Sequence, residues 1–162
     1  MRKLFYLCLG LICLLSCEKE TTPGTTERYF YINSEITPPS EDVGMYVNWT
    51  TGDKTVFRFI YTHPEEKNIA DDELSEIFWI EIPSDVTAFS GNQQADSDIE
   101  VYYTRSCYCY FEAFEFEEFS VSGTKKNNGT WEVSFSMKAK SPSYNEIYEL
   151  EDSGTYFLSQ MN

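Results

Sequence analysis

The sequence predicts an all-β protein, an antiparallel β-sandwich or small barrel of about nine or ten short strands. Two observations lead to this prediction. Apolar and polar residues alternate with period two in several segments, most clearly in residues 131–140, and clusters of Gly, Asn and Pro separate these segments. No long helical pattern interrupts them, so we expect neighbouring strands to be joined mostly by hairpins.

The segment 45–62 predicts a β-hairpin. Gly52-Asp53 suits a two-residue turn, and this pairing places Trp49 opposite Val56 on an apolar face. Arg58 is the only residue on that face that does not match its apolar neighbours.

Five segments extend this pattern on either side of the hairpin. Residues 27–33 predict a first strand, and residues 71–76 a single helical turn. Residues 77–82 are apolar on both faces and therefore predict a central strand. Residues 83–98 read as a loop around a short apolar stretch, and residues 99–105 as another strand.

The apolar phase changes twice within residues 107–122, and each change would turn the side chains to the opposite face. Bulges near Ala113 and at Glu117–Glu118 would restore the core face. We expect a bent strand there.

The turn before the strand at 131–139 can be chosen from the alternation alone. A three-residue loop with Gly129 in the left-handed region pairs Val121 with Phe135, apolar with apolar, whereas a two-residue loop does not. The same register pairs Phe119 with Met137. A closing hairpin is expected over 146–159, turning at Asp152-Ser153-Gly154.

The composition is strongly acidic, with 12 Lys and Arg against 27 Asp and Glu and a net charge of −15. Such a chain should repel nucleic acid and anionic lipid headgroups, so neither is expected as a partner. We expect a single domain over residues 28–162.

The N-terminus has the features of a secretory signal. Arg2 and Lys3 precede an apolar run over 4–15 that is too short to span a bilayer. The following Leu14-Leu15-Ser16-Cys17 resembles the lipobox of bacterial lipoproteins. The resemblance implies that residues 1–16 are a cleaved signal peptide and that Cys17 is lipidated and acylated, which would give a stable membrane anchor.

Residues 17–27 are polar and are expected to form a flexible linker. The acidic residues just after Cys17 resemble the surface-export signals of Bacteroidota lipoproteins. This resemblance implies a lipid-anchored protein of the outer membrane, facing either the periplasm or the cell surface.

Cys107 and Cys109 lie two residues apart on one predicted strand face, about 6.6 Å by the strand rise. This separation is at the far edge of disulfide geometry. Free or buried thiols, a strained disulfide and a metal-binding pair remain as alternatives. A closed zinc site needs four ligands, so we predict no metal site and no cofactor.

Aromatic residues make up 17% of the chain, and four tyrosines cluster in a short span, Tyr102, Tyr103, Tyr108 and Tyr110. If they are exposed, they are candidate ligand contacts for a glycan or another envelope protein. If both faces of their strand are buried, they belong to the core.

No catalytic motif surrounds His63, the single histidine of the chain, and we do not expect an enzyme. The sequence therefore predicts a lipoprotein with a non-catalytic binding or accessory domain of unknown ligand. The alternatives are a glycan-binding component of an uptake system and a lipocalin-like carrier of an apolar ligand.

Overall fold

The computed structural model describes residues 21–38, 47–66, 74–94, 98–106 and 114–160. Within these ranges the chain forms ten strands and no helix, which confirms the predicted all-β class. No helix in the described part of the chain is long and apolar enough to cross a membrane. The strands are β1 (Thr21–Thr22), β2 (Thr25–Thr37), β3 (Asn48–Thr62), β4 (Glu65–Glu66), β5 (Ser75–Pro83), β6 (Ala88–Asn92), β7 (Glu100–Ser106), β8 (Glu115–Lys125), β9 (Trp131–Lys140) and β10 (Ile147–Leu158).

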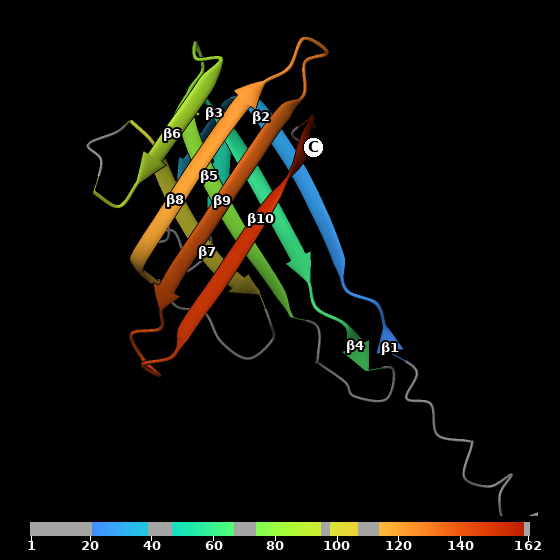
Figure 1. Ribbon diagram of the computed structural model, residues 1–162, viewed down its shortest axis with the longest axis vertical. Coiled ribbons are helices and arrows are strands. Elements are labelled where there is room, and N and C mark those ends of the chain that lie inside the picture. Colours follow the sequence, from blue (N-terminus) through green and yellow to red (C-terminus); the bar gives the residue numbers. More distant parts are fainter. Residues whose placement is uncertain (1–20, 39–46, 67–73, 95–97, 107–113, 161–162) are drawn as a thin grey trace, which may run out of the picture.

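Eight strands form one sheet in the order β6-β8-β9-β10-β2-β3-β5-β7, and β1 pairs with β4 in a separate small sheet (Figure 1). Neighbours in the large sheet are antiparallel except β10 and β2. These two strands run parallel and pair only through Phe157 with Tyr29 and Leu158 with Phe30. Because β6 and β7 are free edges, the described sheet does not close into a barrel.

The sheet folds onto itself as two layers. In Figure 1, β6, β8, β9 and β10 lie in front of β2, β3, β5 and β7. Rings meet across the layers: the ring centroids of Phe59 and Phe135 are 5.1 Å apart, those of Phe78 and Phe135 4.4 Å, and those of Phe57 and Trp131 5.3 Å. The architecture is therefore sandwich-like.

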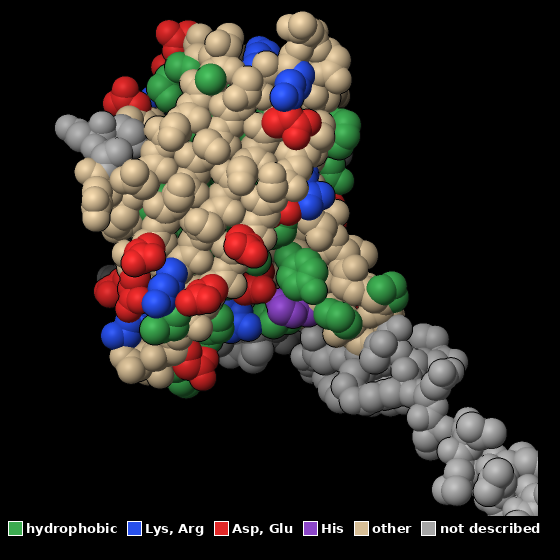
Figure 2. All heavy atoms as spheres, in the orientation of Figure 1, with side chains coloured by type: hydrophobic (Ala, Val, Ile, Leu, Met, Phe, Trp, Pro, Cys, Tyr) green, Lys and Arg blue, Asp and Glu red, His purple; other side chains and the backbone are tan. Residues whose placement is uncertain are grey.

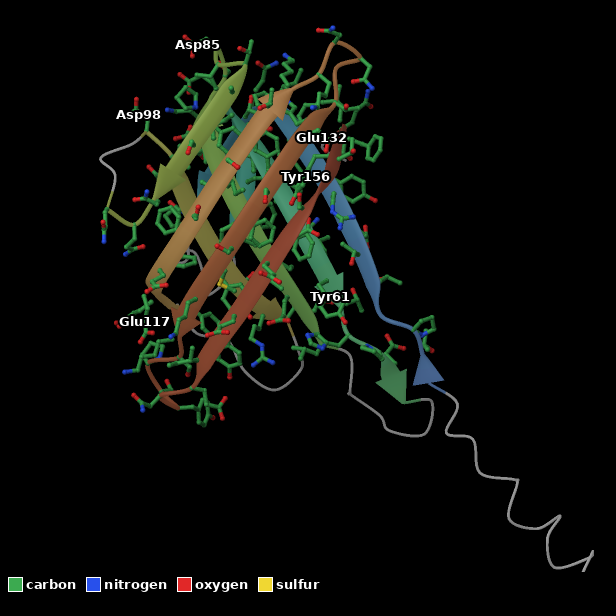
Figure 3. All side chains as sticks on the ribbon, in the orientation of Figure 1. Tyr61, Asp85, Asp98, Glu117, Glu132 and Tyr156 are labelled. Atoms are coloured by element: carbon green, nitrogen blue, oxygen red, sulfur yellow. The ribbon has the colours of Figure 1, made fainter. Side chains whose placement is uncertain are left out.

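Alternate residues of both layers point into this core, as the period-two pattern predicts. Tyr156 of β10 is buried among them, whereas Asp85, Asp98 and Glu117 lie at the periphery (Figure 3). The buried core comprises Phe30, Phe57, Phe59, Phe78, Ile80, Ile82, Tyr103, Val121, Trp131, Val133, Phe135, Met137, Ala139 and Tyr156.

A bidentate ion pair joins β2 to β10, where strand pairing is short. The Nε and Nη2 atoms of Arg28 donate to Asp152 at 2.7 and 2.6 Å. Gly154 allows this approach, since a Cβ there would stand 2.7 Å from Arg28 Nε. The pair holds the two layers together on this side of the sandwich.

The predicted hairpin over 45–62 is wrong. Residues 48–62 form one strand, β3, along the whole of β2, and Ser34 of β2 pairs with both Thr51 and Lys54. Gly52-Asp53 is therefore a bulge within the strand, not a turn. A Cβ at Gly52 would stand only 2.4 Å from the Cβ of Glu35, so the glycine is needed for space.

The predicted closing hairpin over 146–159 is wrong for a similar reason. Residues 147–158 form a single strand, β10, and Asp152-Ser153-Gly154 pairs with residues 133–135 of β9. The Gly154 that resembled a turn residue instead makes room for Arg28.

The register at the β8–β9 turn is confirmed. Val121 pairs with Phe135 and Phe119 with Met137, and Gly129 has a φ of 83°. The register shifts between Phe116 and Glu118, which confirms the second predicted bulge. The first, near Ala113, lies outside the described residues.

The remaining predicted elements differ mainly in their bounds. The strand at 77–82 is β5, which is flanked by β3 and β7 as expected. The helical turn at 71–76 is not found in its described part, because residues 75–76 already belong to β5. The loop over 83–98 contains β6. In the expected linker 17–27, residues 21–22 form β1 and residues 25–27 begin β2.

Candidate functional site

The outer face of the β2-β3-β5-β7 layer carries a row of large side chains. Tyr29 pairs with Arg58, Arg58 with Trp79, and Trp79 with Tyr102, one residue from each strand. Directly paired residues point to the same side of a sheet. At the end of the row, Phe157 of β10 pairs with Tyr29 and is 57% exposed. We call this surface the aromatic face.

A bend in β2 and β3 adds further residues to the aromatic face. The bulge at Gly52-Asp53 lies opposite Ser34, and the adjacent Asn33 has a left-handed φ of 53°. Trp49 pairs with Ile36, five residues from Tyr31, which is about 17 Å along an extended strand. Yet the ring centroids of Trp49 and Tyr31 are only 5.4 Å apart. The tip of the two strands therefore folds back over the outer side of their own sheet.

Folding back creates a small second core. Ile36, Val47, Val56 and Trp79 are buried there, with Trp49, Ile77 and Tyr102 packed around them. The carboxylate of Glu81, whose strand neighbour is Val56, accepts a hydrogen bond of 2.6 Å from the Ile36 N–H. This bond ties the folded tip to β5.

At the centre of the aromatic face, three side chains form a compact triangle. The ring centroids of Trp49 and Trp79 are 5.1 Å apart, and Arg58 Cζ lies 5.1 and 4.9 Å from them. A guanidinium over indole rings is stabilised by cation–π attraction, the more so when it is partly desolvated. Trp79 is 2% exposed, whereas Trp49 and Arg58 are half-buried.

All three members of the triangle carry a buried nitrogen donor without an acceptor. Trp49 Nε1, Trp79 Nε1 and Arg58 Nε have no hydrogen-bond partner among the described residues. Buried polar groups are almost always hydrogen-bonded, so three unpaired donors in contact with one another call for an explanation. Because these donors are buried, a ligand or water could supply acceptor oxygens only if the side chains move to admit it.

The carboxylates beside the triangle already accept hydrogen bonds. Glu100 accepts one from the Tyr102 hydroxyl, and Glu81 accepts the one from Ile36. Burial is the main reason why the pKa of Glu81 is raised. The hydrogen bond from Ile36 lowers this pKa, and the negative charge of Glu100 raises it further. Burial and the bond to Glu100 also raise the pKa of Tyr102.

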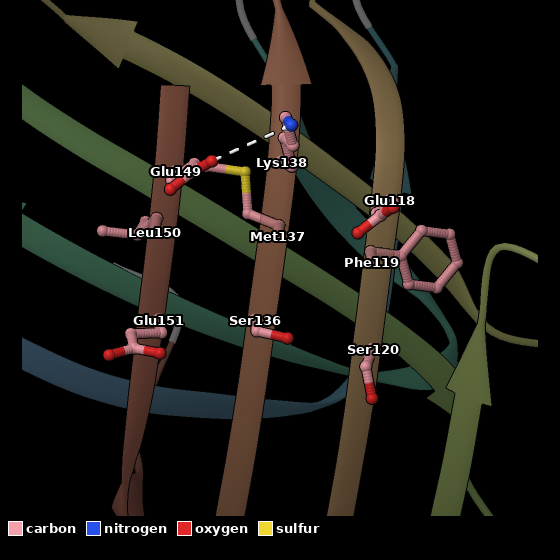
Figure 4. Close-up of a pocket in the computed structure, with 9 residues that line it drawn as sticks. All are labelled: Glu118, Phe119, Ser120, Ser136, Met137, Lys138, Glu149, Leu150 and Glu151. Atoms are coloured by element: carbon pink, nitrogen blue, oxygen red, sulfur yellow. Dashed lines mark ion pairs between the residues drawn. The ribbon is translucent and has the colours of Figure 1, made fainter. Parts of the chain in front are cut away.

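The outer face of the other layer is different in kind, and we call it the serine face. Figure 2 shows it as a broad area with few hydrophobic or charged side chains. A groove of about 550 Å³ crosses it over β8, β9 and β10 (Figure 4). Ser120 and Ser136 line its middle, and Lys138 at its end lies 3.9 Å from Glu149 and 3.7 Å from Glu117. This face carries a groove, but none of the buried unpaired atoms of the described residues; three of those belong to the triangle, and the other two are Arg105 Nε and the Tyr156 hydroxyl. We therefore place the candidate site on the aromatic face.

A second polar cluster closes one end of the core. Glu76 accepts a hydrogen bond from the Tyr103 hydroxyl, lies 2.7 Å from His63 Nε2, and is 4.0 Å from Arg105 Nε. The pKa of Tyr103 is raised, mainly by burial and secondly by this hydrogen bond to Glu76. Because Glu76 and Tyr103 are buried, the cluster stabilises the interior and does not present a ligand surface.

Of the site residues predicted from the sequence, two lie in described strands, and they point in opposite directions. Tyr102 is half-buried on the aromatic face, whereas Tyr103 belongs to the core. Cys17, Cys107, Cys109, Tyr108 and Tyr110 lie outside the described residues. No group of three or more His, Cys, Asp or Glu in the described ranges is arranged to hold a metal ion.

Sequence reasoning missed Trp49, Trp79 and Glu81 as site residues. These side chains come together because of the bend at residues 33 and 52–53, and no local sequence pattern predicts that bend. One signal was available, because Arg58 was the mismatch on an apolar face. Comparison with protein-family models, with curated proteins and with solved structures finds no match to this chain.

Proposed function

We propose that the chain is a lipid-anchored protein of the outer membrane or cell surface, with a non-catalytic sandwich that binds a ligand on its aromatic face. One observation carries the binding role: the contact triangle of Trp49, Arg58 and Trp79, in which each side chain has a buried donor without an acceptor. The lipobox-like sequence ending at Cys17 supports the anchor.

A glycan is the ligand class that suits these side chains best. The apolar faces of sugar rings stack on indole and phenol rings, while sugar oxygens accept hydrogen bonds from N–H donors. Trp49, Tyr29 and Tyr102 are half-buried and supply such rings. The carrier alternative needs a closed barrel with an apolar cavity. The described sheet has two free edges and a core filled with rings, so we do not pursue that alternative.

The binding role can be tested by titrating the full chain, purified in detergent, with a panel of glycans and following tryptophan fluorescence. We expect at least one glycan to change the emission, and Trp49→Ala to weaken its binding by about tenfold or more, since stacked aromatic residues dominate binding energies. Tyr144→Ala is the matched control, because Tyr144 is an aromatic residue 62% exposed at the β9–β10 turn. Equal effects of the two substitutions, or no response to any glycan, would contradict the proposal.

The anchor has its own test. Cys17→Ser removes the sulfur to which lipid would be attached, so the protein should move from the membrane fraction to the soluble fraction of fractionated cells. Ser16→Ala keeps a small residue before the cysteine and serves as the control. Retention of the Cys17→Ser variant in the membrane fraction would contradict the anchor.

A further inference from the structure

We propose that the ligand of the aromatic face carries a carboxylate, as the uronic acid units of acidic glycans do, and that Arg58 binds this group. The inference rests on the proposed binding role of the face and specifies its ligand. Its starting point is a cation without a counter-ion among the described residues, in a chain of net charge −15.

Arg58 differs from the other arginines of the described residues. Arg28 forms a bidentate ion pair with Asp152, with the closer contact at 2.6 Å. The Nε atom of Arg105 is buried without a hydrogen bond, as that of Arg58 is, but it lies 4.0 Å from the carboxylate of Glu76. Arg58 forms no ion pair or hydrogen bond with any described residue, although it is half-buried and its chain is rich in acidic side chains. A partly desolvated cation is costly when it is left unpaired, which favours a ligand that supplies the negative charge.

The position of the guanidinium also favours a carboxylate. Its Nε atom is buried without a partner among the described residues, whereas its two terminal nitrogens are not among the buried unpaired atoms. Contact with Trp49 and Trp79 restricts the guanidinium. A guanidinium held in one place offers paired N–H groups that match the two oxygens of a carboxylate.

The surroundings favour a sugar acid over an acidic peptide. A carboxylate bound at Arg58 would lie in the row between Tyr29 and Trp79, with Trp49 beside it. A uronic acid joins its carboxylate directly to a ring that can stack on such a side chain, whereas a Glu or Asp side chain reaches it on a flexible stem.

The charge of the protein makes this preference measurable. A strongly acidic chain repels anions in general, and the repulsion from distant charges is screened beyond about 8 Å at physiological salt. Glu81 and Glu100 lie on the same face and oppose an anion locally. Any preference for an acidic glycan over its neutral form must therefore come from a specific contact with a cation.

The test uses the full chain in detergent at neutral pH and physiological salt. The probes are a galacturonic acid hexamer and the same hexamer as its methyl ester, which keeps the rings and removes the charge. We expect the acid to bind about tenfold or more tightly than the ester, as judged by tryptophan fluorescence. Arg58→Met keeps an apolar stem over the indole rings and removes the charge, so the acid and the ester should bind this variant with equal affinity.

Two further variants serve as controls for the role of Arg58. Arg105→Met is the matched control, since Arg105 also lies over an aromatic ring, 4.2 Å from the Tyr148 centroid, but faces Glu76. It should leave the preference for the acid unchanged. Arg58→Lys keeps the charge and loses the paired donors, so it should keep only part of the preference. A thermal unfolding curve of each variant separates loss of binding from loss of folding.

The outcomes distinguish this inference from the proposed function. Equal binding of acid and ester would overturn the role of Arg58 and leave the aromatic face as a glycan site. Absence of binding to every glycan, charged or neutral, would overturn the proposed function itself. If poly-glutamate binds as tightly as the hexamer and its binding also depends on Arg58, the inference that the ligand is a sugar acid is wrong. If Arg58→Lys keeps the full preference for the acid, the inference that two N–H groups of Arg58 pair with the carboxylate is wrong.

Discussion

The two outer faces of the sandwich are built from strands with similar inner residues, yet they carry opposite chemistry. The aromatic face has a row of Tyr, Arg and Trp side chains and a second small core. The serine face has Ser122, Ser134 and Ser153 side by side on β8, β9 and β10. Burial between the layers demands apolar residues at every second position of both layers, but it leaves the alternate positions free. The outward-facing side chains, in which the two faces differ, can therefore be selected for function.

The comparison also separates two ways of using a sheet surface. On the serine face, hydroxyl groups meet water, and Lys138 pairs with two carboxylates, Glu117 at 3.7 Å and Glu149 at 3.9 Å. On the aromatic face, the β2–β3 tip covers part of the sheet, and Arg58 forms no ion pair with a carboxylate of the described strands. A groove of about 550 Å³ occurs on the serine face, and three of the buried unpaired donors lie on the aromatic face, so surface shape and hydrogen bonding favour different faces.

The largest difference between the faces should appear on truncation. Trp79→Ala would open a cavity in the second core and should lower the free energy of unfolding by about 3–5 kcal/mol, because Trp79 is 2% exposed. Ser134→Ala on the serine face should change it by no more than about 0.5 kcal/mol, since its side chain is exposed. Urea denaturation of both variants checks this, and comparable losses would mean that the two faces do not differ in burial.

A smaller effect is expected from disturbing the bend that makes the aromatic face. Gly52→Ala would place a Cβ 2.4 Å from that of Glu35, so the strands must shift, at a cost of about 1–3 kcal/mol. The emission of Trp49 should move to longer wavelength as the tip opens. The comparison variant is Gly129→Ala, which has free space around its Cβ and strains only a turn on the other layer. An unchanged spectrum in Gly52→Ala would show that the bend does not depend on this contact.

The smallest effect concerns the charge of Glu81. Its pKa is raised in the folded state, so the folded protein binds more protons above the ordinary value of 4.5, and stability falls as pH rises through the raised pKa. Glu81→Gln keeps an acceptor for the Ile36 N–H without the charge. It should therefore be as stable as the wild type near pH 4 and more stable near pH 7.

Unfolding curves at several pH values test the Glu81 prediction. Glu132→Gln on the serine face is the control, because Glu132 is an exposed carboxylate that accepts a hydrogen bond from Thr155. A Glu81→Gln variant that loses stability relative to the wild type as pH rises would contradict the predicted sign.

Local patterns predicted some parts of this fold well because local geometry controls them. Alternation along residues 131–140 and the left-handed preference of Gly129 were enough to set the β8–β9 register, and both partners lie close in the chain. The same reasoning failed at Gly52 and Gly154. Each glycine resembles a turn residue, but each is required by a side chain from a distant strand, Glu35 or Arg28.

By itself, the sequence determined the all-β class, the inward-facing residues of β8 and β9 and the β8–β9 turn, since burial and backbone preference act on neighbouring residues. Its resemblance to a lipobox predicts the anchor at Cys17. Only the tertiary structure decided that β10 meets β2 in parallel, that the β2–β3 tip folds back, and that Trp49, Arg58 and Trp79 touch. These features join residues from separate strands, and the contacts that stabilise them form only once the sheet has assembled.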